Sequence, residues 1–74
     1  MKNAYNIFLD YEEDTLNFIK TPSKAPVKTI EGKYGIEFLQ DIDGNTVEII
    51  IPEPEIVFGV TIEDIESFLL VKLI

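Results

Sequence analysis

The chain has 74 residues, with 14 aspartates and glutamates against 6 lysines, and its formal net charge is −8. Histidine, cysteine, tryptophan and arginine are all absent. The lack of cysteine excludes disulfides and thiolate zinc sites, and the lack of histidine removes the commonest general base and transition-metal ligand. An acidic chain without arginine also lacks the usual contacts to phosphates and base edges. We therefore expect no enzymatic activity, no cofactor, no metal ion and no direct binding of nucleic acid.

A single domain spanning residues 1–74 is expected for a chain of this size. Such a domain buries only about 60% of the surface of its unfolded chain, so its core is thin unless association supports it. No run approaches the roughly 18 apolar residues of a membrane span, and the N-terminus lacks a signal pattern. We expect a cytoplasmic protein that does not bind membranes.

Two β-rich runs at residues 5–10 and 15–20 predict a first hairpin around a four-residue acidic turn. Its expected register pairs Asp10 with Thr15, Leu9 with Leu16 and Ile7 with Phe18. The prolines and small polar residues of 21–26 predict a loop.

An alternating run at 27–31 predicts the third strand, followed by a type II′ turn at Gly32-Lys33. That turn would pair Thr29 with Ile36, Val27 with Phe38 and Lys28 with Glu37. Asp43-Gly44 then predicts a type I′ hairpin within residues 35–51, because both central positions of that turn need a positive φ. A two-residue loop there pairs Gln40 with Val47, Phe38 with Ile49 and Ile36 with Ile51.

Residues 52–60 are a proline-containing connection, in which 56–60 fit either a short strand or an apolar linker. Thr61 resembles a helix N-cap, and the apolar spacing after it predicts a helix over 61–72. The apolar end at 66–74 also fits a strand. The predicted fold is α+β: a small antiparallel β-meander of about five strands, at residues 5–51, with a C-terminal helix packed on one face.

One face of this sheet collects enough apolar residues for a core beneath one helix. The other face mixes polar residues with large apolar ones, which form a candidate contact surface: Phe8, Ile19, Ile30, Leu39 and Ile50. Cover by the C-terminal segment of the same chain is the alternative explanation.

Two groups of carboxylates resemble sites without completing one. Asp41, Asp43 and Asn45 alternate like the first ligands of an EF-hand loop, but Thr46 and Pro52 stand where glycine and a bidentate glutamate are needed. The acidic turn at 10–14 offers paired carboxylates but no pocket in which one pKa would be raised. We interpret both as solvated turns.

The two hairpins resemble a small, functionally uncharacterised prokaryotic family. Matching positions in the first hairpin are Asp10, Glu12, Asp14 and Leu16, and in the second Gly35, Asp41, Asp43, Gly44, Val47, Ile49 and Ile51. The chain departs from the family pattern at Leu9, Asn17, Phe18, Glu48 and Ile50. The resemblance covers residues 5–51 and implies a small antiparallel β domain without established catalytic residues. Some members lie beside toxin-like genes, which implies an antitoxin or a similar protein-binding role.

The sequence therefore favours a non-enzymatic, acidic protein-binding module, antitoxin-like or regulatory, that works as a homodimer or with a basic protein partner. A nucleic-acid mimic that inhibits a DNA- or RNA-binding protein is one alternative. A small enzyme or ligand-binding domain is another, and convergent carboxylates in a pocket would favour it.

Overall fold

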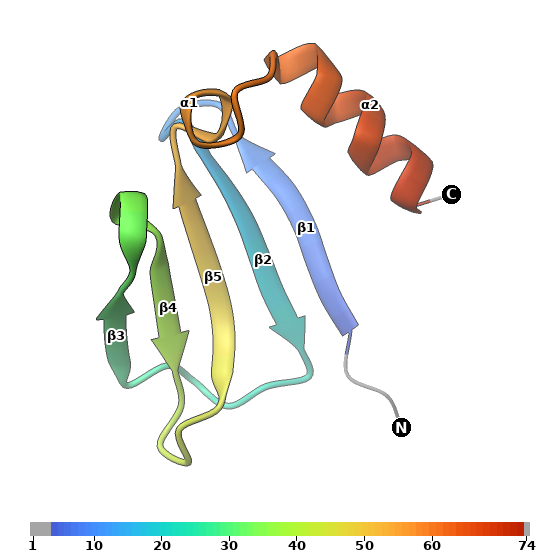
Figure 1. Ribbon diagram of the computed structural model, residues 1–74. Coiled ribbons are helices and arrows are strands. Elements are labelled where there is room, and N and C mark those ends of the chain that lie inside the picture. The colour runs from blue at the N-terminus through green and yellow to red at the C-terminus, as the bar shows by residue number, and fades with distance from the viewer. Residues whose placement is uncertain (1–3, 74) are drawn as a thin grey trace.

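A five-stranded antiparallel sheet and a C-terminal helix form the computed structural model, which describes residues 4–73 and the side chains of 5–68 (Figure 1). The elements in chain order are β1 (Ala4–Asp10), β2 (Thr15–Thr21), β3 (Lys28–Glu31), the 3₁₀ helix η1 (Lys33–Gly35), β4 (Glu37–Gln40), β5 (Thr46–Pro52), α1 (Pro54–Phe58) and α2 (Ile62–Leu73). The predicted α+β class is confirmed. Among the described residues, no helix is both long and apolar enough to cross a membrane.

The strand order in the sheet is β1-β2-β5-β4-β3, which differs from the sequential order of a meander. The last strand, β5, lies between β2 and β4 and pairs with both (Figure 1). Only β3, β4 and β5 follow one another as in a meander. The apolar pattern of a strand predicts which of its faces is buried. It does not predict which strand lies beside it, so the pairing of β5 with β2 could not be read from the sequence.

The first hairpin has the predicted register. Asp10 pairs with Thr15, Leu9 with Leu16 and Ile7 with Phe18. The carboxylate of Asp10 accepts hydrogen bonds from the backbone N–H groups of Glu12 and Glu13, both at 3.1 Å, which folds the acidic turn back on itself.

The hairpin between β4 and β5 keeps Phe38 opposite Ile49, as predicted, but reaches this pair by another route. The N–H of Gly44 donates to the carbonyl of Asp41 at 3.0 Å, and of the two turn residues only Gly44 has a positive φ, so the predicted type I′ turn is wrong. A three-residue loop closes the turn, and an irregularity between Leu39 and Gln40 pairs Gln40 with Thr46. The bulge restores the face that the odd loop length would have reversed.

The predicted register of β3 is wrong. Thr29 pairs with Leu39 rather than with Ile36, because η1 lengthens the connection that was expected to be a two-residue turn. Tyr34 within η1 has a φ of 60°. The shift spans three residues, an odd number, so β3 presents the other set of side chains to each face. Lys28 therefore pairs with Gln40, and Glu31 rather than Lys28 lies opposite Glu37.

Two helices follow the sheet. The short α1 replaces the strand or linker expected at 56–60, with Pro54 at its first turn and Gly59 in the left-handed region at its end. Thr61 caps α2 as predicted: its Oγ1 accepts the N–H of Asp64 at 3.1 Å. The carboxylate of Glu55 in α1 accepts the N–H of Ile62 at 2.7 Å, so α1 helps to fix where α2 begins. Helical structure continues to Leu73, which decides the helix-or-strand alternative for the described part of 66–74.

The core lies where α2 meets one face of the sheet, called the core face here. Ile65 of α2 packs with Leu16 and Ile51, and all three side chains are buried. An apolar row crosses all five strands on this face, through Ile7, Phe18, Ile49, Phe38 and Ile30. α2 stands at the β1 side of the sheet (Figure 1), so Ile30 on the far strand is 39% exposed.

Candidate functional site

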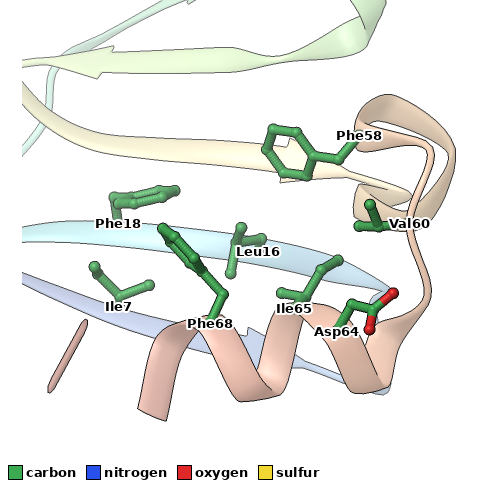
Figure 2. Close-up of a pocket in the computed structure, with 8 residues that line it drawn as sticks. All are labelled: Ile7, Leu16, Phe18, Phe58, Val60, Asp64, Ile65 and Phe68. Carbon is green, nitrogen blue, oxygen red and sulfur yellow. The ribbon is translucent and has the colours of Figure 1, made fainter. Parts of the chain in front are cut away.

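An apolar hollow of about 450 Å³ lies between α2 and the core face of the sheet (Figure 2). It is lined by Ile7, Leu16 and Phe18 of the sheet, by Phe58 and Val60 around the end of α1, and by Asp64, Ile65 and Phe68 of α2. Asp64 is the one charged residue among them. The hollow can therefore bury an apolar group but offers no polar group in its interior.

The chain reversal after α1 places the mouth of this hollow. Gly59 has a φ of 69°, and its N–H donates to the carbonyl of Glu55 at 2.8 Å, which ends α1 and turns the chain. Phe58 and Val60 flank this turn and remain 50% and 41% exposed. Phe68 points from α2 toward Phe18 (Figure 2), yet it is 59% exposed. The large aromatic rings surround the space without filling it.

Carboxylates concentrate at the end of the sheet that carries the hollow. This end holds the β1–β2 turn, α1 and the start of α2 (Figure 1), which are joined by the N–H of Glu53 donating to the carbonyl of Asp14 at 2.8 Å. Its acidic residues are Asp10, Glu12, Glu13, Asp14, Glu53, Glu55, Glu63, Asp64 and Glu66. We call these nine the acidic end.

The lysines of the sheet lie elsewhere. Lys20 and Lys28 sit at the opposite end, where β2 finishes and β3 begins. Lys24 in the connection between them forms an ion pair with Asp43 in the β4–β5 turn. Lys33 belongs to η1, whose Tyr34 and Gly35 lie beside Pro52 at the acidic end, so it is the one lysine among these four that lies near the nine carboxylates.

One hydrogen bond ties the β1–β2 turn to α2 within the acidic end. The hydroxyl of Tyr11 donates to the carboxylate of Glu66. This hydrogen bond raises the pKa of Tyr11 above its ordinary value of 10.0, with further contributions from desolvation and from the negative charges of Glu66 and Glu63. Every one of these effects opposes a further negative charge at this place.

The predicted contact surface loses one of its five residues in the structure. Phe8, Ile19, Leu39 and Ile50 share the face opposite the core, but Ile30 pairs with Phe38 and lies on the core face, because the register of β3 is shifted. Each of these four lies directly opposite polar residues of the neighbouring strands, and the four are diagonal neighbours of one another.

Cross-strand pairing identifies the polar residues on this face. Glu48 lies between Ile19 and Leu39, and Asn17 lies between Phe8 and Ile50. Asn17 is itself buried, only 6% exposed, and its amide donates to Thr15 Oγ1 at 2.9 Å. α2 does not cover this face, since it packs on the core face. The expected alternative, cover by the C-terminal segment, is therefore wrong for the described side chains.

The EF-hand-like residues build a turn. The carboxylate of Asp41 is buried and accepts the N–H groups of Asp43 at 2.9 Å and of Asn45 at 3.0 Å. Asp43 pairs with Lys24 instead of facing the same point. In the part of the chain that the structure describes, no three acidic residues converge to hold a metal ion.

The hollow was not predicted from the sequence, because two of its lining residues, Phe58 and Val60, belong to the connection at 52–60. Pro54-Glu55 followed by an apolar run and Gly59 carried a signal for a short helix, since proline favours the first helical position and glycine the end. No pattern in the sequence indicates that α2 stands away from the sheet here.

No family model, no curated protein and no solved structure matches the chain. The resemblance to the small prokaryotic hairpin family stays a prediction, and so do the roles that it implies.

Proposed function

We propose that this protein is a non-catalytic, acidic binding module that takes an apolar side chain of a basic protein segment into the hollow beside α2. The observation that carries the proposal is the coincidence of an open apolar hollow with the acidic end. Interfaces are typically anchored by an apolar or aromatic residue in a pocket, surrounded by a polar rim. The hollow supplies the pocket, Asp64 supplies a carboxylate at its edge, and the other carboxylates of the acidic end lie at the same end of the sheet (Figure 1).

The composition of the walls favours this kind of partner over a polar ligand. Phe18, Phe58 and Phe68 present three aromatic rings, against which an aliphatic or cationic side chain packs favourably. Burial of one leucine-sized side chain contributes about 1.5–3 kcal/mol. Asp64 at the rim stands where a lysine or arginine next to that anchor would meet it.

The acidic end adds speed and selectivity to such an encounter. Nine carboxylates attract a basic surface and repel an acidic one, and this steering weakens as salt screens it. A role that fits these properties is inhibition of a basic protein by covering its surface, as in an antitoxin-like or regulatory protein.

A synthetic amphipathic peptide tests the proposal. We expect a 14-residue leucine–lysine helical peptide to bind in titration calorimetry, and a leucine–glutamate peptide of the same pattern not to bind. Phe58→Ser should lower the affinity at least tenfold, because it removes one wall of the hollow. Ile42→Ser is the matched control, since Ile42 is 74% exposed in the distant β4–β5 turn. Equal affinities for the two variants would show that the peptide binds by charge alone, away from the hollow.

A second partner that we propose is another copy of the chain. The core is thin, with only four buried hydrophobic residues among those the structure describes, and eleven large hydrophobic side chains there are exposed. Association on a two-fold axis is the commonest way to bury such surface. Light scattering at micromolar concentration and physiological salt should give twice the 8.4 kDa chain mass. A mass of 8.4 kDa throughout would contradict self-association.

A further inference from the structure

The outer edge of β1 has no paired strand among the described residues, and α2 stands on this side of the sheet (Figure 1). β1 runs for seven residues, Ala4–Asp10, and contains no lysine, no proline and no bulge, which are the devices that usually prevent edge pairing. The other edge strand, β3, has four residues, follows Pro26 and carries Lys28 and Glu31 at its ends. Only β1 offers a long edge for a further strand.

We propose that a second copy of the chain adds its β1 to this edge, antiparallel and about a two-fold axis, so that two five-stranded sheets join into one of ten strands. This proposal rests on the self-association proposed above and places it. Antiparallel pairing of identical strands requires residues of the same face to oppose each other, so the axis passes through a residue rather than between two.

An axis at Ile7 uses the whole strand. Ile7 then lies opposite Ile7 of the second copy, Tyr5 opposite its Leu9, and Ala4 opposite its Asp10. The apolar row that crosses the five strands of the core face ends at Ile7. In this register the row continues into the second copy without a polar interruption. Tyr5 and Phe8, each 43% exposed at the edge, gain neighbours on both faces.

The charges of β1 do not oppose this joint strongly, although each copy carries −8. Asp10 is the one charged residue of β1. The two Asp10 residues lie six positions apart along the joined strands, which is about 20 Å at the rise of a β-strand. That separation exceeds the Debye length of roughly 8 Å at physiological salt. The two acidic turns lie at opposite ends of the joint, and the two α2 helices run in opposite directions over one face of the sheet.

Pairing through the face opposite the core is less favourable. Glu48 lies between Ile19 and Leu39, and Glu37 lies beside Ile50. None of the strands places a lysine on that face among the paired residues. A dimer formed there would bury carboxylates without partners.

Light scattering of charge-swapped variants tests the joint. In the proposed register Asn6 lies opposite Phe8 of the second copy, so Asn6→Lys/Phe8→Lys sets lysine against lysine twice. We expect this variant, and separately Asn6→Glu/Phe8→Glu, to give 8.4 kDa where the wild type gives twice that mass. An equimolar mixture of the two variants should recover the doubled mass. Val27→Lys/Thr29→Lys makes the same charge change at the exposed β3 side and should remain dimeric.

The outcomes separate the proposals. A dimer that persists in both charged variants, with unchanged circular dichroism, would overturn pairing through β1 while leaving self-association intact. A wild type of 8.4 kDa would overturn self-association, and pairing through β1 with it, whereas peptide binding in the hollow is measured independently.

Discussion

The hydroxyl of Tyr11 donates a hydrogen bond to the carboxylate of Glu66, 55 residues further along the chain. This hydrogen bond joins the β1–β2 turn to α2. α2 also packs against the sheet through Ile65, which contacts Leu16 and Ile51. The hydrogen bond of Tyr11 and the packing of Ile65 therefore both help to set the position of α2 and the shape of the hollow.

The titration of Tyr11 should report this contact. The hydrogen bond to Glu66 favours the protonated phenol and raises its pKa above 10.0 in the folded state. Its contribution to stability is fully present below pH 10.0 and is lost as the pH rises through the raised pKa. Absorbance at 295 nm, taken as wild type minus Tyr11→Phe, measures this pKa. We expect the pKa of Tyr11 to be lower in Glu66→Gln than in the wild type, and higher in the control Glu12→Gln than in Glu66→Gln. Equal pKa values in the wild type, Glu66→Gln and Glu12→Gln would contradict the contact.

Truncation of Ile65 should release α2. Ile65 is 6% exposed against Leu16 and Ile51, so Ile65→Ala should cost about 2–5 kcal/mol in free energy of unfolding. A twelve-residue helix is not stable alone, so the signal at 222 nm should fall as well. Ile56→Ala in α1 is the matched control, because Ile56 is 75% exposed, and it should change stability by at most about 0.5 kcal/mol. Similar urea midpoints for the two variants would show that Ile65 does not hold the helix.

Replacing Gly44 should strain the backbone of the β4–β5 turn. Its φ is 85°, and a Cβ placed there meets no atom within 4 Å, so the cost of Gly44→Ala comes from the backbone alone. We expect a loss of about 1 kcal/mol, and a smaller loss for Gly44→Asn, which tolerates the left-handed region better. Gly59, with a φ of 69° and equally open surroundings, should respond alike. Urea denaturation checks the order; an alanine variant as stable as the wild type would remove the turn assignment.

The same turn should depend on the carboxylate of Asp41. Asp41→Ala leaves the N–H groups of Asp43 and Asn45 without their acceptor and should cost about 2 kcal/mol. Asp41→Asn keeps an oxygen acceptor and should lose less. Chemical denaturation of the two variants measures the difference, and an asparagine variant weaker than the alanine variant would contradict the role given to the side chain.

How much of this architecture was predictable differs between its two hairpins. The β1–β2 register followed from sequence because apolar residues align on one face only when Leu9 meets Leu16. The same reasoning found the pair of Phe38 and Ile49 but assigned the wrong turn, since loop length and a bulge can compensate each other. For β3 the reasoning failed, because η1 places Tyr34 in the left-handed region, and the residue pattern there does not predict this conformation.

The strand order and the hollow depend on contacts that periodicity does not encode. A period of two indicates a buried face, but it does not identify the neighbouring strand. The predicted contact surface lost Ile30 for this reason, because Ile30 changed face with its register, and Glu48 came to lie directly between Ile19 and Leu39. Phe58 and Val60 were assigned to a connection, so their position over the core face could not be foreseen.

The central place of β5 determines when this protein can fold during synthesis. Until Thr46–Pro52 has left the ribosome, the chain holds a β1–β2 hairpin and a β3–β4 hairpin with no strand to connect them. Isolated two-stranded hairpins are marginal in water, so the nascent chain should stay dynamic over nearly two thirds of its length. The inner edge of β2 is unpaired throughout that period and is open to pairing with other chains. Translation arrested before Thr46 should therefore yield protease-sensitive, aggregation-prone chains, and chains from which α2 has also emerged to bury Leu16 and Ile51 should be protected.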